Sequence, residues 1–104
     1  MYYEMRTYTL KVGTVKEYLK HFEEVGLPVI SKYAKLVGWW YTEIGELNQI
    51  IHIWAYESLD DRTERRAALY RDKAWLEEFI PVAFPMLLKQ ESVLLRPADF
   101  SPIK

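Results

Sequence analysis

The sequence predicts a protein of the α+β class, built from one four-stranded antiparallel sheet with helices on one of its faces. Three observations carry this prediction. The chain has 104 residues, which is the length of a single domain. Half of its residues are hydrophobic, so it can bury a core. Its apolar residues recur with strand and helix periods in the order β-α-β-β-α-β, which we expect to form one domain over residues 1–104.

Charge and composition exclude several kinds of function. The 14 basic and 15 acidic residues leave a net charge of -1 without a block of either sign, so we expect no nucleic-acid partner. No apolar run reaches the roughly 18 residues that cross a bilayer, so we expect no membrane insertion and a cytoplasmic location. The chain has no cysteine, and its two histidines show no metal-ligand spacing. We therefore expect neither a metal nor another cofactor.

The first third of the chain predicts a strand followed by a helix. Residues 2–10 alternate between two faces, which is the period of a strand. Thr14 precedes Glu17 by three positions, as in a capping box, and apolar residues follow at helical spacing. Pro28 lacks the backbone N–H that a helix needs, so this helix should end or bend near Gly26.

Three further strands are expected. Residues 36–44 and 49–57 are rich in aromatic and β-branched side chains, and the short segment 45–48 between them predicts a hairpin connection. Residues 87–96 form a plausible last strand, followed by a proline-containing tail.

A second helical region is expected between the third and fourth strands. Ser58, with Asp61 three positions later, predicts a helix cap, and the charged run 60–66 is expected to face solvent. Asp72 can cap a further helical segment whose apolar stripe is closed by two prolines, Pro81 and Pro85.

This order of elements is that of a ferredoxin-like fold, in which the helices cover one face of the sheet. On the third predicted strand, Ile51, Ile53 and Ala55 are expected to face the helices. The uncovered face would then carry Asn48, Ile50, His52, Trp54 and Tyr56. Because an aromatic and apolar face should not meet water, we expect a second copy of the chain to cover it. The product would be a dimeric α+β barrel.

Several separated motifs resemble one known family. They are EMRTYTL at 4–10, GLP at 26–28, TEIG at 42–45 with LNQ at 47–49, HIWAYE at 52–57, and QES at 90–92 with LRP at 95–97. Together and in this order, they resemble the NIPSNAP family over nearly the whole chain. The resemblance implies a ferredoxin-like dimeric α+β barrel and a homodimer, and it implies little chemistry. The wider superfamily of such barrels includes cofactor-free monooxygenases and isomerases.

The candidate ligand-binding residues fall on one face of neighbouring strands. By strand parity they are Glu4, Arg6 and Tyr8 on the first strand, and His52, Trp54 and Tyr56 on the third. Gln90 and Ser92 on the last strand extend this polar lining. Arg6 could grip a carboxylate, His52 could move a proton, and Trp54 could stack on a ring. The set therefore suits a small planar or anionic molecule.

A purely structural interpretation of the same residues stays open. Glu4 and Arg6 could form a buried ion pair, while the aromatic residues form the core of an interface. Gln90 and Ser92 could simply bond across strands. Which of Trp39 and Trp40 joins His52 depends on the register of the hairpin, which the spacing does not decide.

Three functions are compatible with these patterns. The first is a homodimeric module that binds a small molecule on the sheet face. The second is a cofactor-independent monooxygenase or isomerase of the barrel superfamily, and the third is a purely structural dimerisation protein. A cavity lined by Arg6, Tyr8 and His52 would favour a ligand, whereas a filled face would favour structure. The other histidine, His21, falls off the apolar stripe of its helix and is expected to be exposed.

Overall fold

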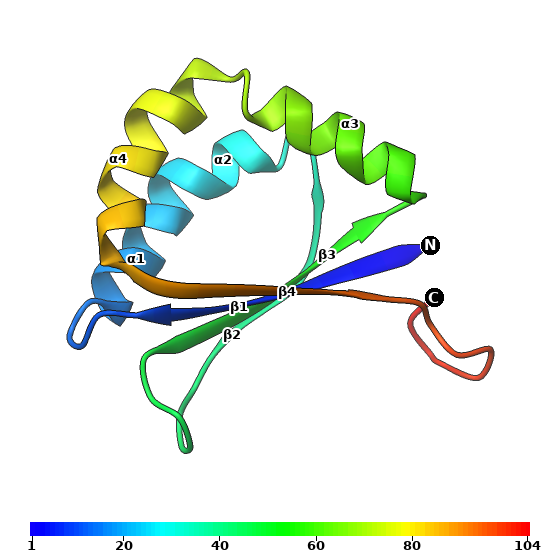
Figure 1. Ribbon diagram of the computed structural model, residues 1–104, viewed down its shortest axis with the longest axis horizontal. Coiled ribbons are helices and arrows are strands. Elements are labelled where there is room, and N and C mark those ends of the chain that lie inside the picture. The colour runs from blue at the N-terminus through cyan, green and yellow to red at the C-terminus, as the bar shows by residue number, and fades with distance from the viewer.

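Helices lie on one face of a four-stranded antiparallel sheet in the computed structural model, which describes residues 1–104 (Figure 1). The strands are β1 (Tyr2–Leu10), β2 (Lys35–Tyr41), β3 (Gln49–Tyr56) and β4 (Leu87–Leu95), in the spatial order β2-β3-β1-β4. The helices are α1 (Val15–His21), α2 (Leu27–Ile30), α3 (Leu59–Leu69) and α4 (Ile80–Ala83), with π-helical segments at Phe22–Gly26 and Trp75–Phe79 and a 3-10 turn at Phe84–Met86. This is the predicted α+β, ferredoxin-like architecture. None of the helices is long and apolar enough to cross a lipid bilayer.

Both helical regions contain a proline and continue through it. Pro28 lies in the first turn of α2 and Pro81 in the first turn of α4. Each has no N–H to donate to the preceding turn, and in each case a π-helical segment directly precedes the short helix. The helix therefore does not end near Gly26 but continues through a π-helical segment into α2.

Two of the three predicted helix caps are confirmed and one is not. The Asp72 carboxylate accepts the N–H of Ala74 at 2.9 Å, at the start of the second part of the later helical region. The Ser58 hydroxyl oxygen accepts the N–H of Asp61 at 3.0 Å, as predicted for the start of α3. The Thr14 hydroxyl instead donates to the carbonyl of Lys11 at 2.6 Å, so no capping box with Glu17 forms. The Thr14 hydroxyl is used in the turn that precedes the helix, so it does not cap the helix.

The side of β3 that the sequence analysis assigned to the helices is wrong. The residues that face the helices are Ile50, His52, Trp54 and Tyr56, and all of them are buried. The open face carries Ile51, Ile53 and Ala55 instead. Asn48 lies before the strand, in a turn, with a φ of 64°.

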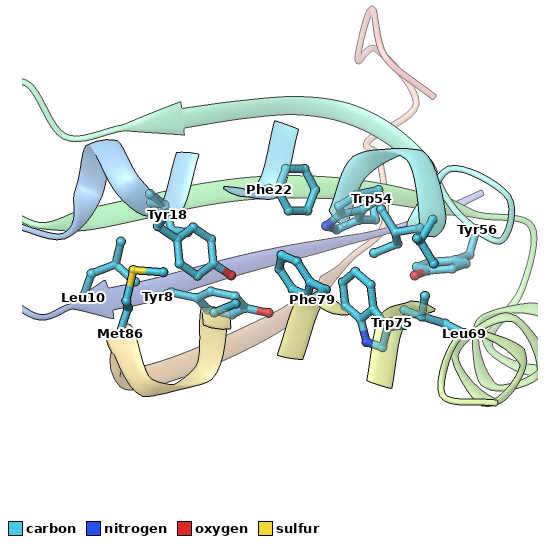
Figure 2. Close-up of a cluster of buried hydrophobic side chains, with 14 residues drawn as sticks. Tyr8, Leu10, Tyr18, Phe22, Trp54, Tyr56, Leu69, Trp75, Phe79 and Met86 are labelled. Carbon is cyan, nitrogen blue, oxygen red and sulfur yellow. The ribbon is translucent and has the colours of Figure 1, made fainter. Parts of the chain in front are cut away.

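Aromatic packing explains this choice of side. The helical regions contribute Phe22, Trp75 and Phe79, and the rings of Trp54 and Tyr56 lie in the same buried cluster (Figure 2). Phe22 meets Trp54 edge to face, with ring centroids 6.4 Å apart. Both faces of β3 are apolar, so hydrophobicity alone does not select the buried one.

Gly26 lets the two helical regions approach closely. A Cβ atom at this position would lie 2.7 Å from the ring of Phe79 and 2.9 Å from the ring of Phe22. Real Cβ atoms are not found so close to other heavy atoms, so the rings would have to move. Glycine is therefore required here for packing, since its φ of -70° suits any residue.

Gly26→Ala should lower the free energy of unfolding by about 1–3 kcal/mol, the usual cost of overpacking a core. The added methyl group would push apart Phe22 and Phe79, which also line the cavity described below. Urea unfolding of the parent and the variant measures the difference. Equal stability would show that the helices separate without cost.

No helix covers the other face of the sheet (Figure 1). The large apolar residues on that face include Met5, Trp40, Ile51, Ile53 and Val93. Trp40 is 52% exposed. The C-terminal residues continue beyond the end of β4 (Figure 1), and most of them line a pocket together with Tyr3, Val37 and Ile53 of the sheet; Phe100 is 91% exposed. Apart from the region beside this tail, the open sheet face is an apolar surface that no other part of the chain covers.

Candidate functional site

A small cavity lies between the sheet and the helices. Its volume is about 30 Å³, which gives room for on the order of two water molecules. The predicted site residues that line it are Arg6, Tyr8, His52, Trp54, Tyr56 and Gln90. Glu4 and Ser92 do not line it but join Arg6 in a hydrogen-bond network. The strand residues chosen from the sequence thus lie together, on the covered face and not on the open one.

Residues of the helices close the cavity, and sequence reasoning did not connect them with the site. They include Tyr18, Phe22, Arg66, Trp75 and Phe79. Figure 2 shows the hydroxyl ends of Tyr8 and Tyr18 directed to the same side, toward Phe79. On β2, Trp39 pairs with His52 and lines the cavity, whereas Trp40 pairs with Ile51 on the open face. This register settles the question that the hairpin left open.

Glu4 is the anchor of a buried charge network. Its side chain is 0% exposed, and Arg6 Nη1 donates to its Oε2 at 2.8 Å. Arg62 of α3 binds the same carboxylate twice, from Nε to Oε1 at 3.1 Å and from Nη2 to Oε2 at 2.7 Å. The Ser92 hydroxyl donates to Oε2 at 2.5 Å. The predicted Glu4–Arg6 ion pair is therefore present, within a larger set.

The network keeps Glu4 ionised. Burial raises the pKa of its carboxyl, but hydrogen bonds from Arg62 and Ser92, with the charges of both arginines, outweigh burial and lower the pKa to about 2. One carboxylate then faces two guanidinium groups, Arg6 and Arg62. The network carries a net positive charge beside the cavity.

The sequence analysis was wrong to place the whole charged run 60–66 in solvent. Arg62 is partly buried against Glu4, and Arg66 lines the cavity. The two arginines are one helical turn apart, so they share a face of α3. That spacing is visible in the sequence, but it identifies a site only once the partner Glu4 is known.

Arg6 and Tyr8 form the polar wall of the cavity. Arg6 Nε donates to the Tyr8 hydroxyl oxygen at 2.7 Å, and the guanidinium lies 5.4 Å from the centre of the Tyr8 ring. Burial raises the pKa of Tyr8, so the phenol stays neutral. Arg6 therefore keeps its full positive charge next to the cavity.

His52 is held in one tautomer. The indole N–H of Trp54 donates to His52 Nδ1 at 2.6 Å, so the imidazole proton must sit on Nε2. Trp39 stacks on the ring with centroids 4.0 Å apart, and Tyr8 meets it edge to face at 4.8 Å. Burial, helped by the charge of Arg6, lowers the pKa of His52 to about 3. His52 is thus a neutral hydrogen-bond donor.

Three buried N–H groups of the cavity wall have no hydrogen-bond partner in the protein. They are His52 Nε2, Trp39 Nε1 and Trp75 Nε1. A buried donor without a partner costs about 1–3 kcal/mol, so such groups are rare unless something else accepts from them. The protein therefore supplies no acceptor for these three donors, although the hydroxyl groups of Tyr8 and Tyr18 and the side-chain amide of Gln90 also line the cavity.

His21 is not the exposed residue that the sequence predicted. Its Nε2 lies 3.0 Å from the carbonyl oxygen of Phe79, and its ring stacks on that of Phe79 with centroids 5.1 Å apart. It ties α1 to the second helical region and does not line the cavity. No group of three or more His, Asp or Glu side chains is arranged to hold a metal ion.

Comparison with known proteins places this geometry in a family context. The NIPSNAP family model matches residues 3–102. The human protein NipSnap homolog 3A is 39% identical over 93 residues, which are 88% of this chain and 37% of that protein. The chain thus spans little more than a third of the length of that relative.

Solved structures share the whole fold. A NIPSNAP family protein from Agrobacterium tumefaciens superposes with a TM-score of 0.96 at 45% identity, covering 100% of this chain and 94% of that one. A putative antibiotic biosynthesis monooxygenase from Nitrosomonas europaea superposes with a TM-score of 0.68 at 11% identity, covering 93% and 98% of the two chains. The second likeness shows a common fold and nothing of a common reaction.

Proposed function

Since the chain belongs to the NIPSNAP family, for which its fold and its sequence agree, we propose that it is a homodimeric module that binds a small anion in the cavity between sheet and helices. The excess of donors at the cavity carries this proposal. Arg6 and Arg66 line the cavity, no carboxylate does, and three buried N–H groups of lining residues have no acceptor in the protein. An anion supplies both the charge and the acceptors.

The cavity favours an anionic group over a planar ring. His52 and Trp39 stack on each other, and Trp75 stacks on Phe79 with centroids 4.3 Å apart. These rings fill the space that a flat ligand would need, and about 30 Å³ is left. A group the size of a carboxylate fits the chemistry and the volume better than an aromatic ring does.

The other two functions have less support. A general base at His52 needs a free basic nitrogen, but Nδ1 accepts from Trp54, and a pKa of about 3 makes the imidazole a weak base. A purely structural role would leave only buried water to accept from His52, Trp39 and Trp75, and it would give the charge of Arg6 and Arg66 at the cavity no purpose. A bound anion would accept hydrogen bonds from the unpartnered donors and would balance the positive charge at the cavity.

Arg6→Met should weaken the binding of a small carboxylate at least tenfold, because a charge-assisted hydrogen-bond donor is lost. Isothermal titration with acetate at pH 7 measures this, and the variant should still fold because Glu4 keeps Arg62 as a partner. Lys89→Met is the control, since it removes one positive charge from an exposed pair with Glu91. Equal affinity of the parent and Arg6→Met would contradict the anion site.

Homodimerisation is proposed through the open sheet face. Met5, Ile51, Ile53 and Val93 lie there without a covering helix, and a self-complementary face is what a two-fold dimer needs. The residues that first suggested this dimer, among them Trp54 and Tyr56, belong to the core of one chain. The open face, with its exposed apolar side chains, is the surface that supports a dimer.

Val93→Lys should turn a dimer into a monomer. Val93 lies on β4 opposite Met5, and a lysine there would place two like charges in an interface expected to bury at least about 1,000 Å². Sedimentation velocity at low micromolar concentration distinguishes the two states. A parent protein that sediments only as a monomer would refute the dimer.

A further inference from the structure

A groove at the edge of the sheet shares a wall with the cavity. It lies beside β2, which is an edge strand, and its volume is about 290 Å³. Its apolar lining includes Leu19, Leu27, Leu36 and Tyr41. Phe22 and Trp39 line both the groove and the cavity, and their ring centroids are 4.1 Å apart. Two rings therefore separate the two spaces.

The two spaces have opposite chemistry. The cavity side presents the guanidinium groups of Arg6 and Arg66 and the unpartnered N–H groups. The groove presents hydrocarbon and rings, with the exposed Glu23 as its charged residue. A molecule that spans both needs an anionic head and an apolar chain.

We propose that the ligand is an amphiphilic carboxylate of medium chain length, with its carboxylate in the cavity and its hydrocarbon chain in the groove. This inference rests on the proposed anion site and adds the class of ligand. The two oxygens of a carboxylate match a space for about two waters. The larger groove takes the remainder of the molecule.

The indole ring of Trp39 lies between the cavity and the groove, and it must rotate to admit the hydrocarbon chain of the ligand. Its indole N–H makes no hydrogen bond, so none has to be broken. The register of β2 against β3 shifts between Leu36 and Gly38, directly before Trp39. The ring is held by stacking on His52, by a tilted contact with Phe22 and by other apolar packing, without a hydrogen bond from its N–H.

A chain-length series tests the proposal. Acetate, butyrate, hexanoate and octanoate are titrated into the protein at pH 7, with octanol as the ligand that lacks the charge. Each buried methylene should raise affinity about fourfold until the groove is full. Octanoate should therefore bind at least 100-fold more tightly than acetate, and more tightly than octanol.

Two leucine variants show where the chain lies. Leu27→Asp places a carboxylate in the groove and should lower octanoate affinity at least tenfold without changing acetate affinity. Leu88→Asp is the control, because Leu88 is 63% exposed and lines neither space. Tyr41→Ala, at an exposed groove residue, repeats the test if Leu27→Asp does not fold.

The outcomes separate this inference from the anion site. Acetate binding that depends on Arg6, with no gain from longer chains, would overturn the amphiphile and leave the anion site in place; a groove covered by a second subunit would give this result. Octanoate binding that is insensitive to both groove variants would also overturn it. Failure of every carboxylate to bind would overturn both proposals.

Discussion

Lowering the pH from 7 to 5 should cost the protein about 2 kcal/mol of unfolding free energy, mainly through His52. The unfolded imidazole titrates near 6.5, whereas burial keeps the pKa in the folded protein at about 3. Between these values the unfolded state binds one more proton, so stability falls by about 1.4 kcal/mol per pH unit as the pH drops. This contribution is complete above pH 6.5 and is lost toward pH 3.

Urea unfolding at several pH values between 7 and 5 measures the effect. His52→Gln keeps an acceptor for the Trp54 indole but cannot be protonated in this range, so most of the pH dependence should disappear. His21→Gln, at the other histidine, is the control. It should lose as much unfolding free energy between pH 7 and pH 5 as the parent protein does. The window ends at pH 5 because Glu4 and the other carboxylates contribute below it. The same pH dependence in the parent and His52→Gln would show that His52 is accessible to protons.

Glu4→Gln should have opposite effects in two backgrounds. In the parent it leaves Arg6 and Arg62 without their common carboxylate, and breaking a buried ion pair in this way costs about 3–5 kcal/mol. In a variant that carries Arg6→Met and Arg62→Met, Glu4 is itself the unpaired buried charge. Removing that charge should then restore at least half of the stability that the double variant lost.

The single arginine variants should be mild by comparison. Arg6→Met leaves Glu4 bonded to Arg62 and Ser92, and Arg62→Met leaves it bonded to Arg6 and Ser92. The sequence indicated only the pair of Glu4 and Arg6, and the structure adds Arg62 as a second cation that keeps Glu4 paired when Arg6 is lost. Urea unfolding at pH 7 of all these variants completes the cycle. If Glu4→Gln also destabilises the variant that carries Arg6→Met and Arg62→Met, then Arg6 and Arg62 are not what stabilises the charge of Glu4.

Local sequence patterns predicted most strands and helices correctly, because each of these elements depends mainly on the residues within it. The strand alternation of residues 2–10 and the Ser58–Asp61 cap are properties of short segments, and both are present. Strand parity likewise grouped Arg6 with Tyr8 and His52 with Trp54. These groupings hold whichever side of the sheet faces the helices.

Contacts between distant segments could not be predicted in this way. The side of β3 that is buried depends on the rings that Phe22 and Phe79 bring from the helices. Arg62 reaches Glu4 across 58 positions of the chain, and nothing in its helix signals that partner. The place of Trp39 depends on a register shift in β2 that the spacing does not reveal.

The anion site can be tested most directly in crystals soaked in sodium bromide, because the anomalous signal of bromine locates a bound anion without assumptions. The soak should give a strong peak inside the cavity, in contact with His52 Nε2 and the Arg6 guanidinium, and crystals of Arg6→Met should lose it. Peaks at surface lysines alone, with an unoccupied cavity between Arg6 and His52, would contradict the proposed function.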